Sequence, residues 1–240
     1  MASLRILLAV GWLIASGGHA LAASSETGSI AGQVKLVGDV PTLPPQPVYT
    51  HTDTCGSTVT DERLVVDDQR DLANVVVYVQ DAPPGIVASE PPPAMDNLRC
   101  RFIPHVVATT VGQTLSIHNS DPFLHDAHAW LGTKTLFNRA LIKGATIREQ
   151  LDEPGLVHIN CNVRHTWMQA YVFVGRDPLH AVTGSDGRFR IDGIPPGTYT
   201  VTMWHELVGS QDHKVTVTAG QTTMLDGELA VTAPPPAAAS

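Results

Sequence analysis

The chain has 240 residues, of which 16% are charged and 5% are aromatic, and its formal net charge is -8. This acidic balance argues against binding nucleic acid or an anionic membrane surface, and it favours a basic protein partner. The 20 glycines and 18 prolines favour short strands and turns over long helices, so we expect an all-β fold.

Residues 1–22 have the layout of a secretory signal peptide. Arg5 precedes an apolar run, and Ala20-Leu21-Ala22 forms a small-residue cleavage site. The apolar run is short for a membrane span, and no later stretch reaches spanning length. We therefore expect a periplasmic or secreted protein with no membrane span in the mature chain.

Apolar patterning predicts two strands in the first hundred residues. Residues 29–36 alternate apolar and polar side chains, which is typical of a half-buried strand. Residues 41–47 are rich in proline and predict an extended connector. Residues 74–79 form a continuous apolar run that is long enough for a central strand.

A strand that ends at Cys161 follows in the middle of the chain. Cys161 shares one face of this strand with Val157 and Ile159, so its sulfur should lie on the buried side at the strand end. His165 and Met168 then lie on the connection to the next apolar strand, where a rigid scaffold can hold them.

Turn signals and alternating strands return after residue 178. The turns are expected at 183–187 and 194–197, with strands at 188–191, 198–203 and 213–217. Residues 231–240 are rich in alanine and proline and predict a disordered tail.

One short loop carries a thiol, an imidazole and a thioether, from Cys161, His165 and Met168. His125 can bring a second imidazole from an upstream strand. Soft sulfur stabilises Cu(I) and imidazole suits both oxidation states, so this set predicts one mononuclear copper site. It is a poor set for structural zinc. His128 is the alternative to His125, because the two should point to opposite faces of a strand and only one can serve.

Three cysteines cannot all pair in an oxidising compartment. If a metal holds Cys161, then Cys55 and Cys100 remain to form a disulfide. In the alternative, Cys161 is an inert buried thiol and Met168 is an ordinary core methionine. No motif for hydrolysis or phosphate binding is specific enough to predict an enzyme.

The residues around this loop resemble a cupredoxin. The resemblance rests on the segments Val111-Gly112-Gln113-Thr114, Asn119-Ser120-Asp121 and Pro154-Gly155, followed by the Cys161, His165 and Met168 spacing. It implies a Greek-key β-sandwich over residues 98–176, copper ligands at His125, Cys161, His165 and Met168, and His165 near the surface as the exit for the electron. One departure is Asp126, where such proteins commonly have an asparagine that ties the ligand loops together. An ionised carboxylate cannot donate that hydrogen bond.

Residues 29–36 and 182–201 resemble the carboxypeptidase regulatory-like domain, a transthyretin-like, Ig-like β-sandwich with no catalysis of its own. Because these segments flank the cupredoxin block, the combination implies a cupredoxin nested in a discontinuous sandwich of residues 23–97 and 177–230. Proteins of this combined type are often called methylamine utilisation or plastocyanin-like. The likeness implies a one-electron carrier with a redox partner protein. The alternative is a copper-sequestering or cell-envelope binding module without a redox role.

Overall fold

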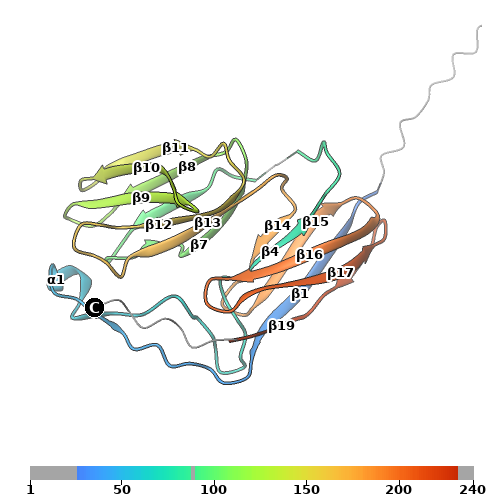
Figure 1. Ribbon diagram of the computed structural model, residues 1–240, viewed down its shortest axis with the longest axis horizontal. Coiled ribbons are helices and arrows are strands. Elements are labelled where there is room, and N and C mark those ends of the chain that lie inside the picture. Colours follow the sequence, from blue (N-terminus) through green and yellow to red (C-terminus); the bar gives the residue numbers. More distant parts are fainter. Residues whose placement is uncertain (1–25, 88–89, 232–240) are drawn as a thin grey trace, which may run out of the picture.

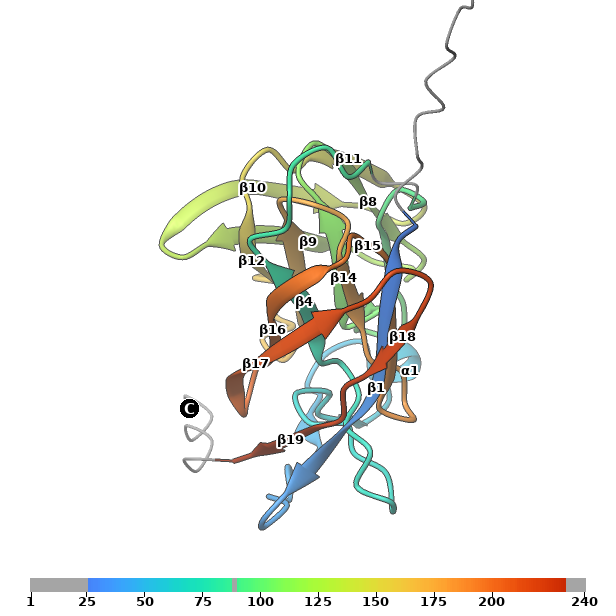
Figure 2. The same cartoon turned by 90° about the vertical axis from the view of Figure 1, so that its right-hand side faces the viewer.

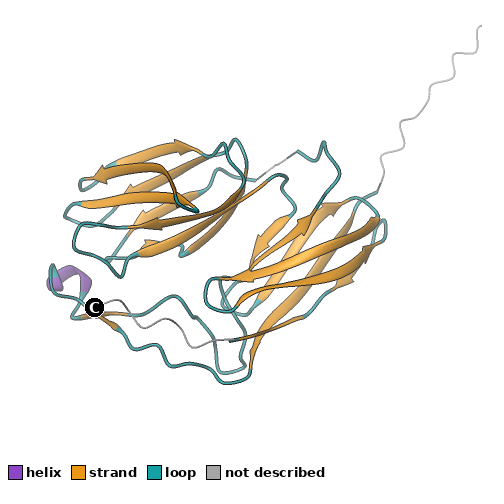
Figure 3. Ribbon diagram, viewed as in Figure 1, coloured by secondary structure: helices purple, strands orange, loops and turns teal. Residues whose placement is uncertain are grey.

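The computed structural model describes residues 26–87 and 90–231, and nearly all of its regular structure is β (Figure 3). Two β-sandwiches lie side by side, and residues 41–73 form a connector that reaches from the first to the second (Figure 1). The helix α1 (Thr52–Cys55) lies on this connector. No helix within the described ranges is long and apolar enough to cross a membrane. The expected signal peptide and residues 232–240 of the expected tail lie outside the described residues.

The first sandwich holds two four-stranded sheets. In one sheet, β1 pairs antiparallel with β15 and parallel with β18 and β19 (Figure 2). In the other sheet, β4 lies between β14 and β16, so both of its edges are paired. Its continuous apolar run suits such a central position, where side chains on both faces are at least partly buried. The bounds are β1 (Gly28–Val37), β15 (Arg188–Ile194), β18 (Thr222–Met224), β19 (Gly227–Ala230), β14 (His180–Val182), β4 (Val76–Gln80), β16 (Gly197–His205) and β17 (Gly209–Val217).

The turn expected at 183–187 lies against β1 and requires a glycine. Gly187 has φ +67, and a Cβ added there would lie 2.5 Å from the carbonyl oxygen of Val34. Only glycine meets both the left-handed backbone and this close approach without strain.

The second sandwich holds a five-stranded sheet in the order β10-β9-β12-β13-β7 and a four-stranded sheet in the order β11-β8-β5-β6. Their inward side chains form one continuous core, separate from the core of the first sandwich. The bounds are β5 (Ala94–Asn97), β6 (Phe102–Ile103), β7 (Val106–Thr110), β8 (Thr114–Asn119), β9 (His125–Leu131), β10 (Lys134–Leu141), β11 (Thr146–Gln150), β12 (Gly155–Asn160) and β13 (Gln169–Gly175).

All strands of the second sandwich lie between β4 and β14 in the sequence, and so interrupt the first. Two segments depart from the predicted boundary at residue 97. Residues 94–97 form β5, which pairs with β6 and β8 in the second sandwich. The connector also places Val48, Cys55 and Val59 in the second core, where β2 (Gln46–Pro47) pairs with β3 (Thr58–Val59). Burial of these apolar side chains stabilises the connector against this sandwich.

Polar and aromatic side chains join the two sandwiches. His105 forms a buried ion pair with Glu206. Burial lowers the pKa of His105, but the hydrogen bond and charge of Glu206 more than offset this effect and raise it overall. Beside this pair, the Tyr171 and Trp204 ring centroids lie 5.3 Å apart.

Two buried histidines should make the protein sensitive to acid. Burial lowers the pKa of His180 and of His205 to about 4, with His105 adding to the effect at His205. Between pH 6.5 and 4 the unfolded chain then binds more protons at these sites than the folded chain, so acidification favours unfolding. We expect each to lower the free energy of unfolding by on the order of 1 to 2 kcal/mol between pH 7 and pH 5.

The double variant His180→Asn, His205→Gln isolates this effect. Urea unfolding of the apo-protein at pH 7 and pH 5 should show a smaller loss for the variant than for the unchanged protein. An equal loss in both proteins would contradict the assignment.

Candidate metal centre

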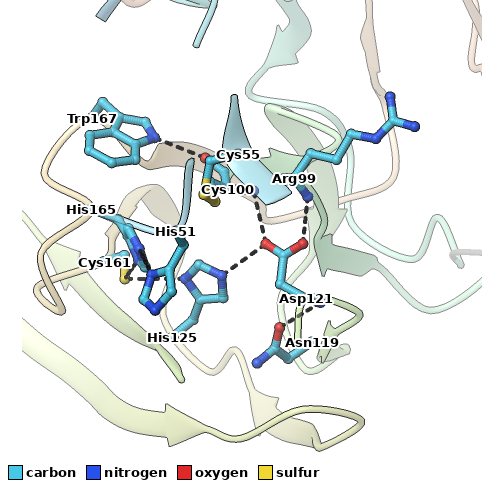
Figure 4. The surroundings of a disulfide bond; sticks show 10 residues. All are labelled: His51, Cys55, Arg99, Cys100, Asn119, Asp121, His125, Cys161, His165 and Trp167. Atoms are coloured by element: carbon cyan, nitrogen blue, oxygen red, sulfur yellow. Dashed lines mark hydrogen bonds and ion pairs between the residues drawn. A yellow bond between two sulfur atoms is a disulfide. The ribbon is translucent and has the colours of Figure 1, made fainter. Parts of the chain in front are cut away.

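Three of the predicted ligands converge at one end of the second sandwich (Figure 4). The Sγ atom of Cys161 lies 3.7 Å from Nδ1 of His125 and 3.8 Å from Nδ1 of His165. Antiparallel pairing of β9 with β12 explains the meeting, because the start of one strand lies beside the end of the other. One sulfur and two imidazole nitrogens within 4.8 Å of one another are a donor set that could hold a copper ion.

Met168 lies in the same core and is 1% exposed. Its backbone closes the loop, since its N–H donates to the carbonyl of His165 at 2.8 Å and its own carbonyl accepts from the N–H of Cys161 at 3.2 Å. Arg164 takes the left-handed conformation, with φ 56, at the tight turn of this loop. The axial role of Met168 remains a prediction.

Asp121 fixes the His125 ring. Its Oδ2 lies 2.9 Å from Nε2 of His125, and its two oxygens also accept the backbone N–H groups of Arg99 and Cys100. Burial raises the pKa of the Asp121 carboxyl, but these hydrogen bonds outweigh it and hold the pKa below its ordinary value. The carboxylate therefore accepts from Nε2–H, which leaves the lone pair of Nδ1 free on the side of Cys161.

Asn119 holds the turn of the Asn119-Ser120-Asp121 segment through its side-chain amide. Its amide nitrogen donates to the carbonyls of Phe123 and Leu141, and its oxygen accepts the N–H of Asp121. These three bonds hold the backbone turn that aims Asp121 at His125.

Asp126 ties the ligand loop to β9 by accepting hydrogen bonds. Its Oδ1 lies 2.5 Å from the N–H of Asn162 and 3.2 Å from that of Val163. A carboxylate can therefore join the two segments here although it cannot donate. Burial raises the pKa of the Cys161 thiol to about 12, although the backbone N–H groups of Asp126 and Val163 lower it, and the Asp126 carboxylate adds a smaller increase. Metal binding must therefore displace a tightly held proton from the sulfur.

His165 is fully buried, which corrects the expectation that it lies near the surface. The connector covers it: Nδ1 of His51 lies 3.4 Å from Nε2 of His165, and the His51 ring stacks on Phe123 with centroids 3.8 Å apart. Burial, followed by the nearby His125 and His51, lowers the pKa of His165 to about 4. The ring is thus neutral at pH 7, which is the form that binds a metal.

Sequence reasoning missed His51, Phe123 and the role of Asp121. His51 is 114 residues from His165 and no local pattern marks it. Its proximity follows from the path of the connector. The alternative ligand His128 faces away from the cluster, where its ring is within hydrogen-bond distance of Thr135 and Asn162.

The predicted disulfide is present and adjoins the centre. Cys55 is bonded to Cys100, and both sulfurs lie within 4.8 Å of each other and of a ring nitrogen of His165. Cys161 is a free, buried cysteine. No pattern in the sequence indicates that the disulfide and the metal ligands are neighbours.

Solved structures similar to this chain include several copper proteins. Amicyanin, in the reduced state of a point mutant, is 18% identical, with 41% of this chain and 97% of that chain covered and a TM-score of 0.32. The purple cupredoxin from Nitrosopumilus maritimus is 22% identical, with coverages of 35% and 99% and a TM-score of 0.31. The copper-containing nitrite reductase (NirK) from Thermus scotoductus SA-01 is 23% identical, with 39% of this chain covered and a TM-score of 0.32. This chain spans 24% of that enzyme. Likeness at these scores carries no argument about function.

Sequence comparison matches the C-terminal strands of the first sandwich to a family model. No curated protein matches the chain. The family model of the carboxypeptidase regulatory-like domain matches residues 169–230, which run from β13, a strand of the second sandwich, to β19. The match does not extend to β1 or β4, which the structure places in the same sandwich as β14 to β19. The all-β chain thus carries, in its C-terminal strands, a match to the carboxypeptidase regulatory-like domain.

Proposed function

We propose that the protein binds one copper ion through His125, Cys161 and His165, with Met168 as a weak axial ligand, and acts as a one-electron carrier and not as an enzyme. The observation that carries the proposal is the position of Cys161 Sγ, at 3.7 and 3.8 Å from two imidazole Nδ1 atoms in a buried site. When bound in such a set, copper can alternate between Cu(I) and Cu(II).

The protein's own contribution is to hold the donor atoms still. Asp121 orients His125, Asp126 anchors the turn after Cys161, and the Met168 backbone closes the loop. Each donor is therefore fixed from outside, so a change of oxidation state should require little rearrangement. Because the four proposed ligands are at most 2% exposed, water has little access to them.

In this proposal the protein acts in the periplasm or outside the cell, with a redox protein as its partner. The Cys55–Cys100 disulfide supports an oxidising compartment. The net charge of -8 supports a basic surface on the partner.

Copper loading tests the proposal directly. We expect Cu(II) to give an intense charge-transfer band near the red end of the visible spectrum, because a single thiolate joins two imidazoles. A visible titration of the protein checks this, with Cys161 first shown to be reduced by mass spectrometry. A protein that stays colourless under these conditions would rule out the thiolate copper centre.

One observation favours a second candidate, a copper-holding or cell-envelope binding module without a redox role. The ring of His165 is 0% exposed, so no ligand edge is open to a partner. The reduction potential and the electron self-exchange rate distinguish the two functions. A carrier should exchange rapidly between Cu(I) and Cu(II), whereas a holding protein should strongly prefer one state.

A further inference from the structure

The two ligand histidines have different outer partners. Nε2 of His125 faces the buried carboxylate of Asp121, whereas Nε2 of His165 faces Nδ1 of His51. His51 is not on the ligand loop or on a strand of the second sandwich. It is an exposed residue of the connector, immediately before α1.

The chemistry of imidazole fixes the direction of this contact. A ring that offers Nδ1 to a metal carries its proton on Nε2. In His165 that proton points toward Nδ1 of His51, which must then accept it, at a distance of 3.4 Å that is long for such a bond. His51, an exposed residue, in turn carries its own proton on Nε2.

The connector holds His51 firmly in this position. Its ring lies nearly parallel to Phe123, with an interplanar angle of 11°. Its carbonyl accepts the N–H groups of Thr54 and Cys55, and Cys55 is bonded to Cys100.

Cys100 links this anchor to the rest of the centre. Its N–H donates to Asp121, the partner of His125, and its carbonyl accepts from Nε1 of Trp167 on the ligand loop (Figure 4). The disulfide thus ties the segment that carries His51 to both sides of the site.

We propose that His51 is the outer hydrogen-bond partner of His165, which positions that ring for the metal and covers its outer edge. The proposal rests on the copper site proposed above. His51 is a positioning residue and not a ligand, because its Nδ1 faces the nitrogen of His165 that points away from Cys161. A redox partner that docks at this end would meet His51 instead of a ligand ring.

The backbone at His51 offers a clean test. His51 has φ 55, in the left-handed region that glycine adopts without strain. His51→Gly should therefore remove the ring without disturbing the chain. Asp81→Gly is the matched control, because Asp81 is exposed, has φ 52 and lies after β4 in the first sandwich.

We expect His51→Gly to weaken Cu(I) binding by about 10-fold to 100-fold, the usual effect of losing a partner of a metal-bound histidine. Competition with a chromophoric Cu(I) chelator measures this. Free imidazole should restore binding, and His51→Gln, whose side-chain oxygen can accept the bond, should bind nearly as well as the unchanged protein. In the diamagnetic Cu(I) protein, the Nε2–H proton of His165 should give a protected NMR signal that His51→Gly loses.

Several results would overturn the proposal. One is a His51→Gly variant that binds Cu(I) as tightly as the unchanged protein. Another is a loss of binding that neither imidazole nor His51→Gln restores, since that would indicate a role in folding the connector. Failure of the copper site itself would look different. The unchanged protein would then bind no copper, or Cys161→Ser would bind copper as tightly as the unchanged protein does.

Discussion

Replacing Cys161 with serine is expected to abolish the visible colour of the copper-loaded protein completely. The colour requires charge transfer from a thiolate to Cu(II), and a serine hydroxyl at the same position is a harder donor that keeps its proton. Serine is close to cysteine in size, so the fold should persist although the site is buried. Visible absorption measures the loss, and circular dichroism checks the fold.

Met168→Leu is the matched comparison for this substitution. Leucine nearly conserves the volume of the buried methionine, so we expect a loss of less than about 1.5 kcal/mol in stability. The colour should remain, because the thiolate and both imidazoles are unchanged. The reduction potential should rise, because Cu(II) loses a donor. If Cys161→Ser and Met168→Leu behave alike, the axial role of Met168 is wrong.

Local patterns predicted much of the architecture. Period-2 alternation identified the strand at residues 29–36 and the strand that ends at Cys161, because a sheet face buries every second side chain. The apolar run at 74–79 corresponds to β4, displaced by a residue or two at its ends. These features depend only on neighbours in the chain, so the sequence carries them directly.

Contacts between segments far apart in the chain could not be predicted from local patterns. Residues 94–97 lie on the first sandwich's side of the predicted boundary, yet they form β5 and pair with β8, which comes after β6 and β7 in the chain. The connector appeared to be an extended spacer, but it supplies His51, Val48 and Cys55 to the second sandwich. Such contacts depend on which surfaces remain open after the sheets have formed.

The proposed site likewise combines features that local patterns predict with a long-range contact that they do not predict. The donor residues were visible as residue types at close spacing, and Asp121 stood in a segment that the resemblance had already marked. Burial of His165 was not visible, because the residue that covers it comes from the connector. If the protein carries electrons as proposed, the exit would then lie at the connector and not at the ligand loop.

Removing the disulfide should have the largest effect on stability. In the chain-entropy model, a cross-link across 45 residues stabilises the folded chain by about 4 kcal/mol, because it restricts the unfolded chain. We expect the double variant Cys55→Ala, Cys100→Ala to lose about this free energy of unfolding. Urea unfolding should be done on the apo-proteins, because bound metal would add its own stabilisation.

The double cysteine variant should also weaken the metal site, for a reason separate from global stability. Without the disulfide, α1 loses its covalent tie to Cys100, and His51 becomes free to leave His165. Removing the disulfide should then lower the copper affinity of a protein that has His51. It should not lower the affinity of His51→Gly, where the ring is already absent. Comparing these four proteins as a double-mutant cycle isolates the coupling. An equal loss of affinity in both backgrounds would show that the disulfide supports the centre through Asp121 or Trp167, and not by holding His51 in place.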